Sequence, residues 1–309
     1  MPTAPPDRSV LRPALHLLGI ALLSLAGMWV LMRFALHSYT GRQWDTLGMY
    51  SVGGTIARYD RMVLFLSIVT VPHLIQATLV CTVLAAIQRR WAVAAAIPVM
   101  IAGASVTTQV LKNYVFHAVT GPNTLPSGHS TTGVILAVAS VWAVPRIARP
   151  YAVAAAGFVA VSIGMGTVAA YWHRPSDVYA AALVCLAWLG LGAAGVLALR
   201  ARSTTRLSSG RPWPLLAASI LAMVGAWLFI FGLIGYRFNG ASAAMYLFDA
   251  FVTVTVTGGC ALVVWWAALW ADRFDPRPEP APRQGSLGST FGDSHQASHP
   301  SAPIGTSSR

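Results

Sequence analysis

Long apolar runs separated by short polar segments dominate this chain. Each run approaches the ~20 residues that an α-helix needs to cross about 30 Å of hydrocarbon. The pattern predicts eight membrane-spanning helices, of which the fourth is the shortest. Their expected ranges are 14–36, 62–87, 91–111, 130–144, 151–171, 177–199, 213–236 and 250–271. The sequence therefore indicates an all-α integral membrane protein.

The polar segments suggest how the chain is divided. Residues 1–13 form a proline-containing leader, and residues 14–200 hold the first six spans. Residues 201–271 add two further spans. Residues 272–309 are rich in Pro, Ser, Gly and Arg, a composition that cannot bury a core, so we expect a disordered tail.

Composition agrees with a membrane protein. Charged residues make up 10% of the chain and hydrophobic residues 56%, whereas a soluble domain carries about 25% charged residues. The three cysteines, Cys81, Cys185 and Cys260, all fall within predicted spans. We expect them to act as small packing residues and not as a disulfide framework.

The basic residues indicate an orientation. With a cytoplasmic N-terminus, fourteen of the 21 basic residues face the cytoplasm, which favours cytoplasmic N- and C-termini. Although the net charge is +12, the charges are scattered between spans, so nucleic acid is not an expected partner. The arginine-heavy, alanine-rich composition is typical of a high-GC bacterial genome, so we expect the cytoplasmic membrane of a bacterium.

A set of polar residues is expected at one membrane face. Lys112, the only lysine, ends the third span, and His129 opens the fourth after a Pro-Ser-Gly sequence. His173 ends the fifth span, and Asp177 opens the sixth. Since these four ends lie on the same side of the membrane, the side chains are expected to meet at the outer surface.

The residue types suit the binding and attack of a phosphate. A helix that opens after Ser127 and Gly128 presents backbone N–H groups to an anion, although Ser127 is equally suited to capping that helix. A carboxylate at Asp177 can fix the tautomer of His173 and free its other nitrogen to attack. Two histidines and a carboxylate could also be ligands of a zinc ion, but the lysine and the Ser-Gly turn are better suited to binding phosphate.

These residues resemble the motifs of the type 2 phosphatidic acid phosphatase family, integral-membrane lipid phosphatases related to the vanadium haloperoxidases. The Pro-Ser-Gly-His sequence at 126–129 matches the second family motif completely. His173 and Asp177 match the catalytic end of the third motif, and Lys112 matches the start of the first. The resemblance covers about residues 62–200, and the last two spans lie outside it.

Two arginines of the family motifs are missing. Val119-Thr120 stand where the first motif has Arg-Pro, and Gly166-Thr167 stand where the third has Ser-Arg. Losing two charge-assisted contacts without substitutes would cost about 1.5–3 kcal/mol for each. The candidate substitutes are Arg174, His117, Arg58 and Arg61.

The resemblance implies a two-step mechanism. His173 would attack phosphorus and form a phosphohistidine, while Asp177 orients it and His129 serves as general acid and then base. The implied phosphate-binding residues are Lys112, Ser127, Gly128 and Arg174. The scheme requires no metal and no cofactor.

The resemblance thus implies hydrolysis of a phosphomonoester or pyrophosphate on a lipid at the outer membrane face. Candidate substrates are phosphatidate, phosphatidylglycerol phosphate, polyprenyl pyrophosphate and a prenyl-linked sugar phosphate. Alternatives are a lipid-linked phosphotransferase with the same site and a non-catalytic lipid-binding protein. A transporter is less favoured, because transporter sites lie near the midplane and these polar groups gather at one face. The sequence carries no signal for the oligomeric state.

Overall fold

The computed structural model describes residues 8–53, 59–119, 123–200, 212–234 and 242–275. These ranges contain helices and no strand, so the predicted all-α membrane bundle is confirmed. The α-helices are α1 Arg8–Met32, α2 Tyr39–Val52, α3 Tyr59–Leu66, α4 Val71–Ile87, α5 Trp91–Val110, α6 Gly128–Ala143, α7 Arg149–Ala169, α8 Pro175–Arg200, α9 Pro212–Ile234 and α10 Ala243–Phe274. Short π-helical segments extend α1 (Arg33–His37) and α5 (Leu111–Val115), and a 3-10 turn, Arg146–Ala148, precedes α7.

Each of the eight predicted spans overlaps helical structure, although residues 235 and 236 of the seventh lie outside the described residues. Within the described ranges, six helical segments are long and apolar enough to cross a membrane, and the bent pair α3–α4 makes a seventh if it is one span. The helix of the fourth predicted span, α6, has 16 residues. The chain is therefore a multi-pass membrane protein.

The predicted span 62–87 is not one continuous helix. The axes of α3 and α4 differ by 48° at the break between them. Thr70 caps the new helix by accepting the N–H of His73, and the ring Nδ1 of His73 lies 2.8 Å from the carbonyl oxygen of Ile68. Pro72 occupies the first turn of α4, where its missing N–H has no consequence. Local polar residues thus restart the helix.

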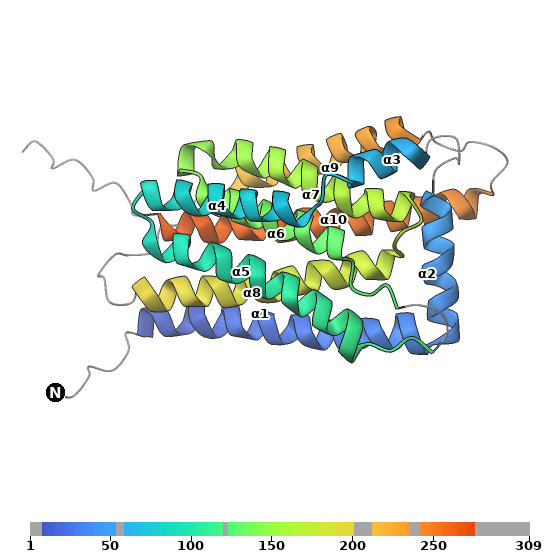
Figure 1. The fold of residues 1–309 in the computed structure, drawn as a ribbon, viewed down its shortest axis with the longest axis horizontal. Helices are drawn as coiled ribbons and strands as arrows, with labels where there is room; N and C mark the ends of the chain where they lie inside the picture. Colours follow the sequence, from blue (N-terminus) through green and yellow to red (C-terminus); the bar gives the residue numbers. More distant parts are fainter. Residues whose placement is uncertain (1–7, 54–58, 120–122, 201–211, 235–241, 276–309) are drawn as a thin grey trace, which may run out of the picture. The chain divides into compact units, whose positions relative to one another are not determined.

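Helix α2 lies between the first two predicted spans, where the apolar pattern predicts no helix. Ser38 caps it by accepting the N–H of Gly41, and its buried positions, Gly41, Asp45, Gly48 and Val52, recur every three or four residues. They therefore share one face, which packs against α10, α7 and α8. Figure 1 shows α2 crossing the ends of the long helices.

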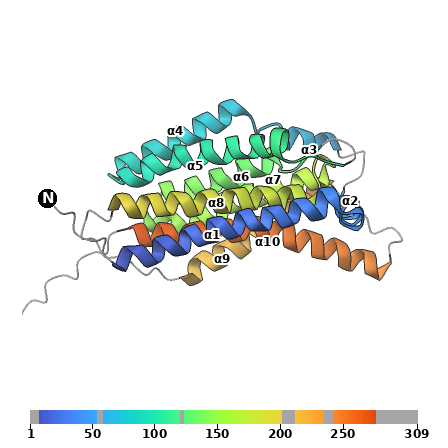
Figure 2. The ribbon, with the colours of Figure 1, turned by 90° about the horizontal axis from the view of Figure 1, so that it is seen from below.

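Small residues allow the long helices to approach closely. Helix α1 lies along α8 (Figures 1 and 2), where a Cβ at Gly190 would stand 2.8 Å from the carbonyl oxygen of Leu17. Gly157 of α7 similarly faces Ala222 of α9. The three cysteines are buried and free, which confirms their expected role in packing.

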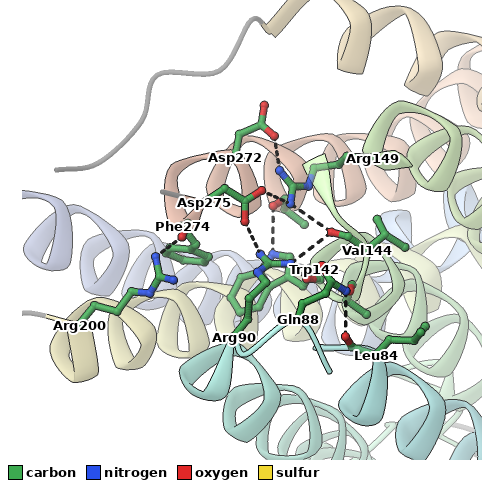
Figure 3. Close-up of polar contacts among 12 residues, drawn as sticks. Leu84, Gln88, Arg90, Trp142, Val144, Arg149, Arg200, Asp272, Phe274 and Asp275 are labelled. Carbon is green, nitrogen blue, oxygen red and sulfur yellow. Dashed lines mark hydrogen bonds and ion pairs between the residues drawn. The ribbon is translucent and has the colours of Figure 1, made fainter. Parts of the chain in front are cut away.

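A buried ion-pair network joins several helix ends (Figure 3). It includes Arg149 at the start of α7, so it lies at the opposite end of that helix from the loop that follows it. Arg149 pairs with Asp272 and, at 2.8 Å, with Asp275. Arg90, which precedes α5, pairs with Asp275 at 3.1 Å and donates to the carbonyl oxygen of Trp142 at 2.6 Å. The network therefore ties the C-terminal helix α10 to α5, α6 and α7.

Helix α10 extends past the expected start of the tail at residue 272 and ends at Phe274. Arg200, the last residue of α8, donates to the carbonyl oxygen of Phe274. The ion pairs of Asp272 and Asp275 explain why the helix continues beyond the predicted end of the eighth span. Residues 276–309, the rest of the expected tail, lie outside the described structure.

Candidate active site

Two loop-to-helix junctions meet at the candidate site. Helix α6 begins at Gly128 and α8 begins at Pro175. The backbone N–H of Ser127 donates to the carbonyl oxygen of Asp177 at 3.0 Å, which joins the two junctions directly. The residues predicted from the second and third motifs therefore lie together.

His173 lies in the loop between α7 and α8 and is 7% exposed. Its Nδ1 lies 3.0 Å from Oδ2 of Asp177, and the same oxygen accepts the backbone N–H of Arg174 at 3.0 Å. The carboxylate favours a proton on Nδ1, which leaves the lone pair of Nε2 available. The backbone N–H of His173 donates to the carbonyl oxygen of Thr167, so the ring and its backbone are both held.

His129 lies beside this loop, ahead of the apolar run that begins at residue 130. Its ring packs edge-on against Trp172, with 5.4 Å between centroids. Burial lowers the pKa of His129, and the charges of His173 and Lys112 lower it further. His129 is therefore within electrostatic reach of both residues, and its neutral form is favoured.

Ser127 serves as the N-cap of α6. Its side chain is fully buried, and its Oγ accepts the backbone N–H of Ser130 at 3.3 Å and the Ser130 hydroxyl at 3.0 Å. At Gly128, a Cβ would meet only Nε2 of Gln109, at 3.7 Å. No acceptor among the described residues bonds the N–H groups of Gly128 and His129, which begin the helix and remain available to an anion.

Two cations flank the cluster. Lys112 lies in the π-helical end of α5, and its carbonyl oxygen accepts a hydrogen bond from Asn123 at 2.9 Å. Asn123 also accepts the N–H of Leu125, which braces the segment that leads into Ser127. The guanidinium group of Arg174 makes no hydrogen bond or ion pair with another described residue, and the residue is partly buried.

The position of a missing motif arginine has a structural role here. Thr167 is fully buried, and its hydroxyl donates to the carbonyl oxygen of Gly164 and lies 3.4 Å from the Ser130 hydroxyl. Its carbonyl oxygen accepts the N–H groups of Trp172 and His173. Thr167 therefore supports the histidine loop and the cap of α6, and supplies no charge.

Of the other proposed substitutes, the structure describes His117 and Arg61. Both are exposed and make no described hydrogen bond or ion pair with the cluster. Arg58 and Thr120 lie outside the described residues. Within the described ranges, no three His, Cys, Asp or Glu side chains are grouped as a metal site requires.

Three residues that support the site, Asn123, Thr167 and Trp172, are not among those predicted from the sequence. The sequence Asn123-Thr124-Leu125 is typical of a turn in which an Asn side chain bonds the N–H two residues on, so Asn123 was detectable. Thr167 and Trp172 could not be detected from the sequence, because their partners Ser130 and His129 lie on a different helix.

The model of the PAP2 superfamily matches residues 26–204, more than half of the chain. The chain belongs to the PAP2 superfamily. No curated protein matches the chain, and no solved structure matches it. PAP2 members are generally phosphatases that act on phosphate esters. The PAP2 region begins within α1 and ends beyond α8, so it includes α2 and excludes α9 and α10.

Proposed function

We propose that this PAP2 protein hydrolyses a phosphomonoester or pyrophosphate of a membrane lipid through a phosphohistidine on His173. The observation that carries the proposal is the pairing of His173 with Asp177 beside the open N-terminus of α6. A nucleophile, an orienting carboxylate, a second histidine and an anion-binding helix end together suit phosphoryl transfer.

In the first step, Nε2 of His173 attacks phosphorus while the bond from phosphorus to the leaving oxygen breaks. Asp177 holds the proton on Nδ1 and stabilises the positive charge that develops on the ring. His129 gives a proton to the leaving oxygen. A bound phosphate dianion favours the protonated form of His129 that this step needs, because it opposes the effect of the neighbouring cations.

In the second step, water attacks the phosphohistidine. His129, now neutral, takes a proton from that water while the bond between phosphorus and nitrogen breaks. Inorganic phosphate leaves, and His173 regains its lone pair. The lowered pKa of His129 suits this step, since a neutral imidazole is the effective base.

Phosphate binding would rest on fewer cations than in the family motifs. The N–H groups of Gly128 and His129, Lys112 and Arg174 are the proposed contacts. Ser127 would act through its capping role, because its hydroxyl oxygen already accepts two hydrogen bonds. Each charge-assisted contact contributes about 1.5–3 kcal/mol, so Arg174 is decisive as the replacement for a missing arginine.

An apolar groove supports a lipid substrate. The groove has a volume of about 280 Å³ and is formed by α4, α6 and α7, with Thr132, Gly133, Leu136 and Ala156 among its lining residues. Thr132 and Gly133 follow His129 by three and four residues, so they lie on the same side of α6, one turn away. A hydrocarbon chain in this groove would place its phosphate near His129.

The proposed location is the outer face of a bacterial cytoplasmic membrane. More arginines lie on the side of the membrane that holds the N-terminus than on the other side. By the positive-inside rule, this excess supports a cytoplasmic N-terminus. The phosphate would then approach from the outer leaflet.

The test is phosphate release by the full-length protein in detergent from a panel of lipid phosphates and pyrophosphates, with EDTA present. We expect release to survive EDTA and to fall to background in His173→Ala. Arg174→Ala should raise KM and lower kcat, whereas Arg12→Ala, the same change at an exposed site on α1, should change neither.

Three other results would count against the proposal. Release that EDTA abolishes would contradict the metal-free scheme. Transfer of labelled phosphate to a lipid acceptor, with none released to water, would establish the phosphotransferase alternative. A folded wild-type protein that releases phosphate from no lipid would favour a non-catalytic lipid-binding protein.

A further inference from the structure

A carboxylate far from the family motifs contacts the catalytic loop. Asp45 of α2 is 6% exposed, and its Oδ1 accepts the backbone N–H of Ser176 at 2.9 Å. Its Oδ2 accepts the Ser176 hydroxyl at 2.6 Å. Because Ser176 is the second residue of α8, its N–H has no acceptor within that helix. Asp45 therefore caps α8 from 131 residues away.

The same face of α2 packs closely around the loop that carries His173. A Cβ at Gly48 would stand 3.0 Å from Cγ of Pro175, and a Cβ at Gly53 would overlap the ring of Tyr171. Tyr171 has a φ of 59°, a left-handed conformation that surrounding contacts must hold in a residue other than glycine. Helix α2 and the residue after it thus hold the loop on both sides of His173.

Ser176 lies between residues that set the geometry of the nucleophile. Asp177 follows it directly and binds Nδ1 of His173 and the N–H of Arg174 through one oxygen. A shift of the first turn of α8 would move that oxygen relative to the imidazole. A displacement of about 1 Å at such a contact can cost ~10²-fold in rate.

The charges near Asp45 couple it to the same cluster. Burial raises the pKa of Asp45 to about 6, the two hydrogen bonds from Ser176 oppose the rise, Asp177 adds to it and Arg174 reduces it. The phenol of Tyr179 also lies within electrostatic reach. Burial thus disfavours the carboxylate form of Asp45, while Ser176 and Arg174 favour it.

We propose that Asp45 is a positioning residue of the active site. It fixes the first turn of α8, and through that turn it aligns Asp177 and His173 for attack. The inference rests on the proposed phosphatase function. It makes α2, which the family motifs do not include, a part of the catalytic framework.

The test compares Asp45→Ala, Asp45→Asn and Asp60→Ala in the full-length protein. Asp60 is an exposed carboxylate on α3, so its replacement is a matched control. We expect Asp45→Ala to lower kcat about 10²-fold with KM changed less than roughly 3-fold, because alignment is lost while phosphate contacts remain. Asp45→Asn keeps an acceptor for the Ser176 N–H and should recover kcat to within about 10-fold of wild type.

Equal kcat in wild type and Asp45→Ala would overturn the inference. So would equal losses in both Asp45 variants, or a change confined to KM. If Asp45→Ala does not fold, Ser176→Ala removes only the hydroxyl contact and should lower kcat about 10-fold, while the melting temperature falls by only a few degrees. An unchanged kcat in that variant would overturn the inference as well.

Binding of orthovanadate, a phosphate mimic, distinguishes a failure of the proposed function from a failure of the inference about Asp45. Binding is measured by calorimetry for each variant. A wild-type protein that neither releases phosphate nor binds vanadate would overturn the proposed function and this inference together. An active, vanadate-binding wild type with a fully active Asp45→Ala would overturn this inference alone.

Discussion

Ser127 and Asp177 are joined through their backbones, with the N–H of Ser127 donating to the carbonyl oxygen of Asp177 at 3.0 Å. This contact links the start of α6 to the first turn of α8. Because no side chain takes part, a substitution at Asp177 can change the partner of His173 while the two junctions stay together.

Asp177→Asn should therefore test orientation of the nucleophile. We expect kcat to fall by about 10²–10⁴-fold, because an amide cannot stabilise the charge that develops on His173. The melting temperature in detergent should change by only a few degrees. Steady-state kinetics on a lipid phosphate and a thermal melt check this, and a kcat near that of wild type would contradict the role of Asp177.

Lys112→Gln should raise the pKa of His129, because the positive charge of Lys112 disfavours the protonated imidazole. NMR titration of labelled histidines measures the change, and His129→Asn identifies the signal. The alkaline limb of kcat/KM should move to higher pH, since His129 would stay protonated longer. Lys112→Arg keeps the charge and should leave the titration in place. An unmoved His129 titration in Lys112→Gln would show that the two residues are not coupled.

Thr167→Arg restores the arginine of the family motif but should not improve activity. The site is fully buried, and the Thr167 hydroxyl contacts Gly164 and Ser130. A buried, unpaired guanidinium is expected to lower the melting temperature and the activity together. Thr167→Ser keeps the hydroxyl and is the control. Higher activity in Thr167→Arg would show that position 167 faces the phosphate.

Substitutions at two adjacent alanines of α7 test whether the groove binds the hydrocarbon chain of the substrate. Ala156 lines it, whereas Ala155 is exposed on the outside of the helix. Ala156→Phe should reduce kcat/KM for a long-chain lipid phosphate at least ~10-fold and spare a short, water-soluble phosphate ester, because the ring fills space that a chain would occupy. Ala155→Phe should affect neither substrate. Equal effects on both substrates would argue against a chain in this groove.

Arg149→Met tests the ion-pair network. It leaves Asp272 buried without its partner, which should cost about 3–5 kcal/mol. The melting temperature should fall, while activity per folded molecule at low temperature should hold, because the site is at the other end of α7. Arg89→Met, an exposed arginine at the same end, is the control. Similar melting temperatures in both variants would contradict a stabilising network.

The spans could be predicted from the sequence because the length of an apolar run is a local property of the chain and does not depend on contacts with distant residues. The sequence also placed His129, His173 and Asp177 together, since alternating spans return to the same face. Helix α2 was missed because it has few apolar residues and its buried face packs mainly against helices that are distant in the chain, α10, α7 and α8.

The break between α3 and α4 had a local signal in Thr70 and Pro72, which suit a helix start. Asp45 had none, because its partner lies 131 residues away. The role of Thr167 is likewise fixed by Ser130, on another helix.

Helix α10 lies outside the PAP2 region, yet the interior of that region depends on it. The indole N–H of Trp142 donates to the carbonyl oxygen of Ala267, and the described carboxylates that pair with Arg149 are those of Asp272 and Asp275. A chain cut after residue 204 would keep every family motif but leave an indole without an acceptor and a buried guanidinium without a counter-charge. We therefore expect the smallest piece that folds to be longer than the family region, and C-terminal deletions to be tolerated only if they leave Asp275 in place.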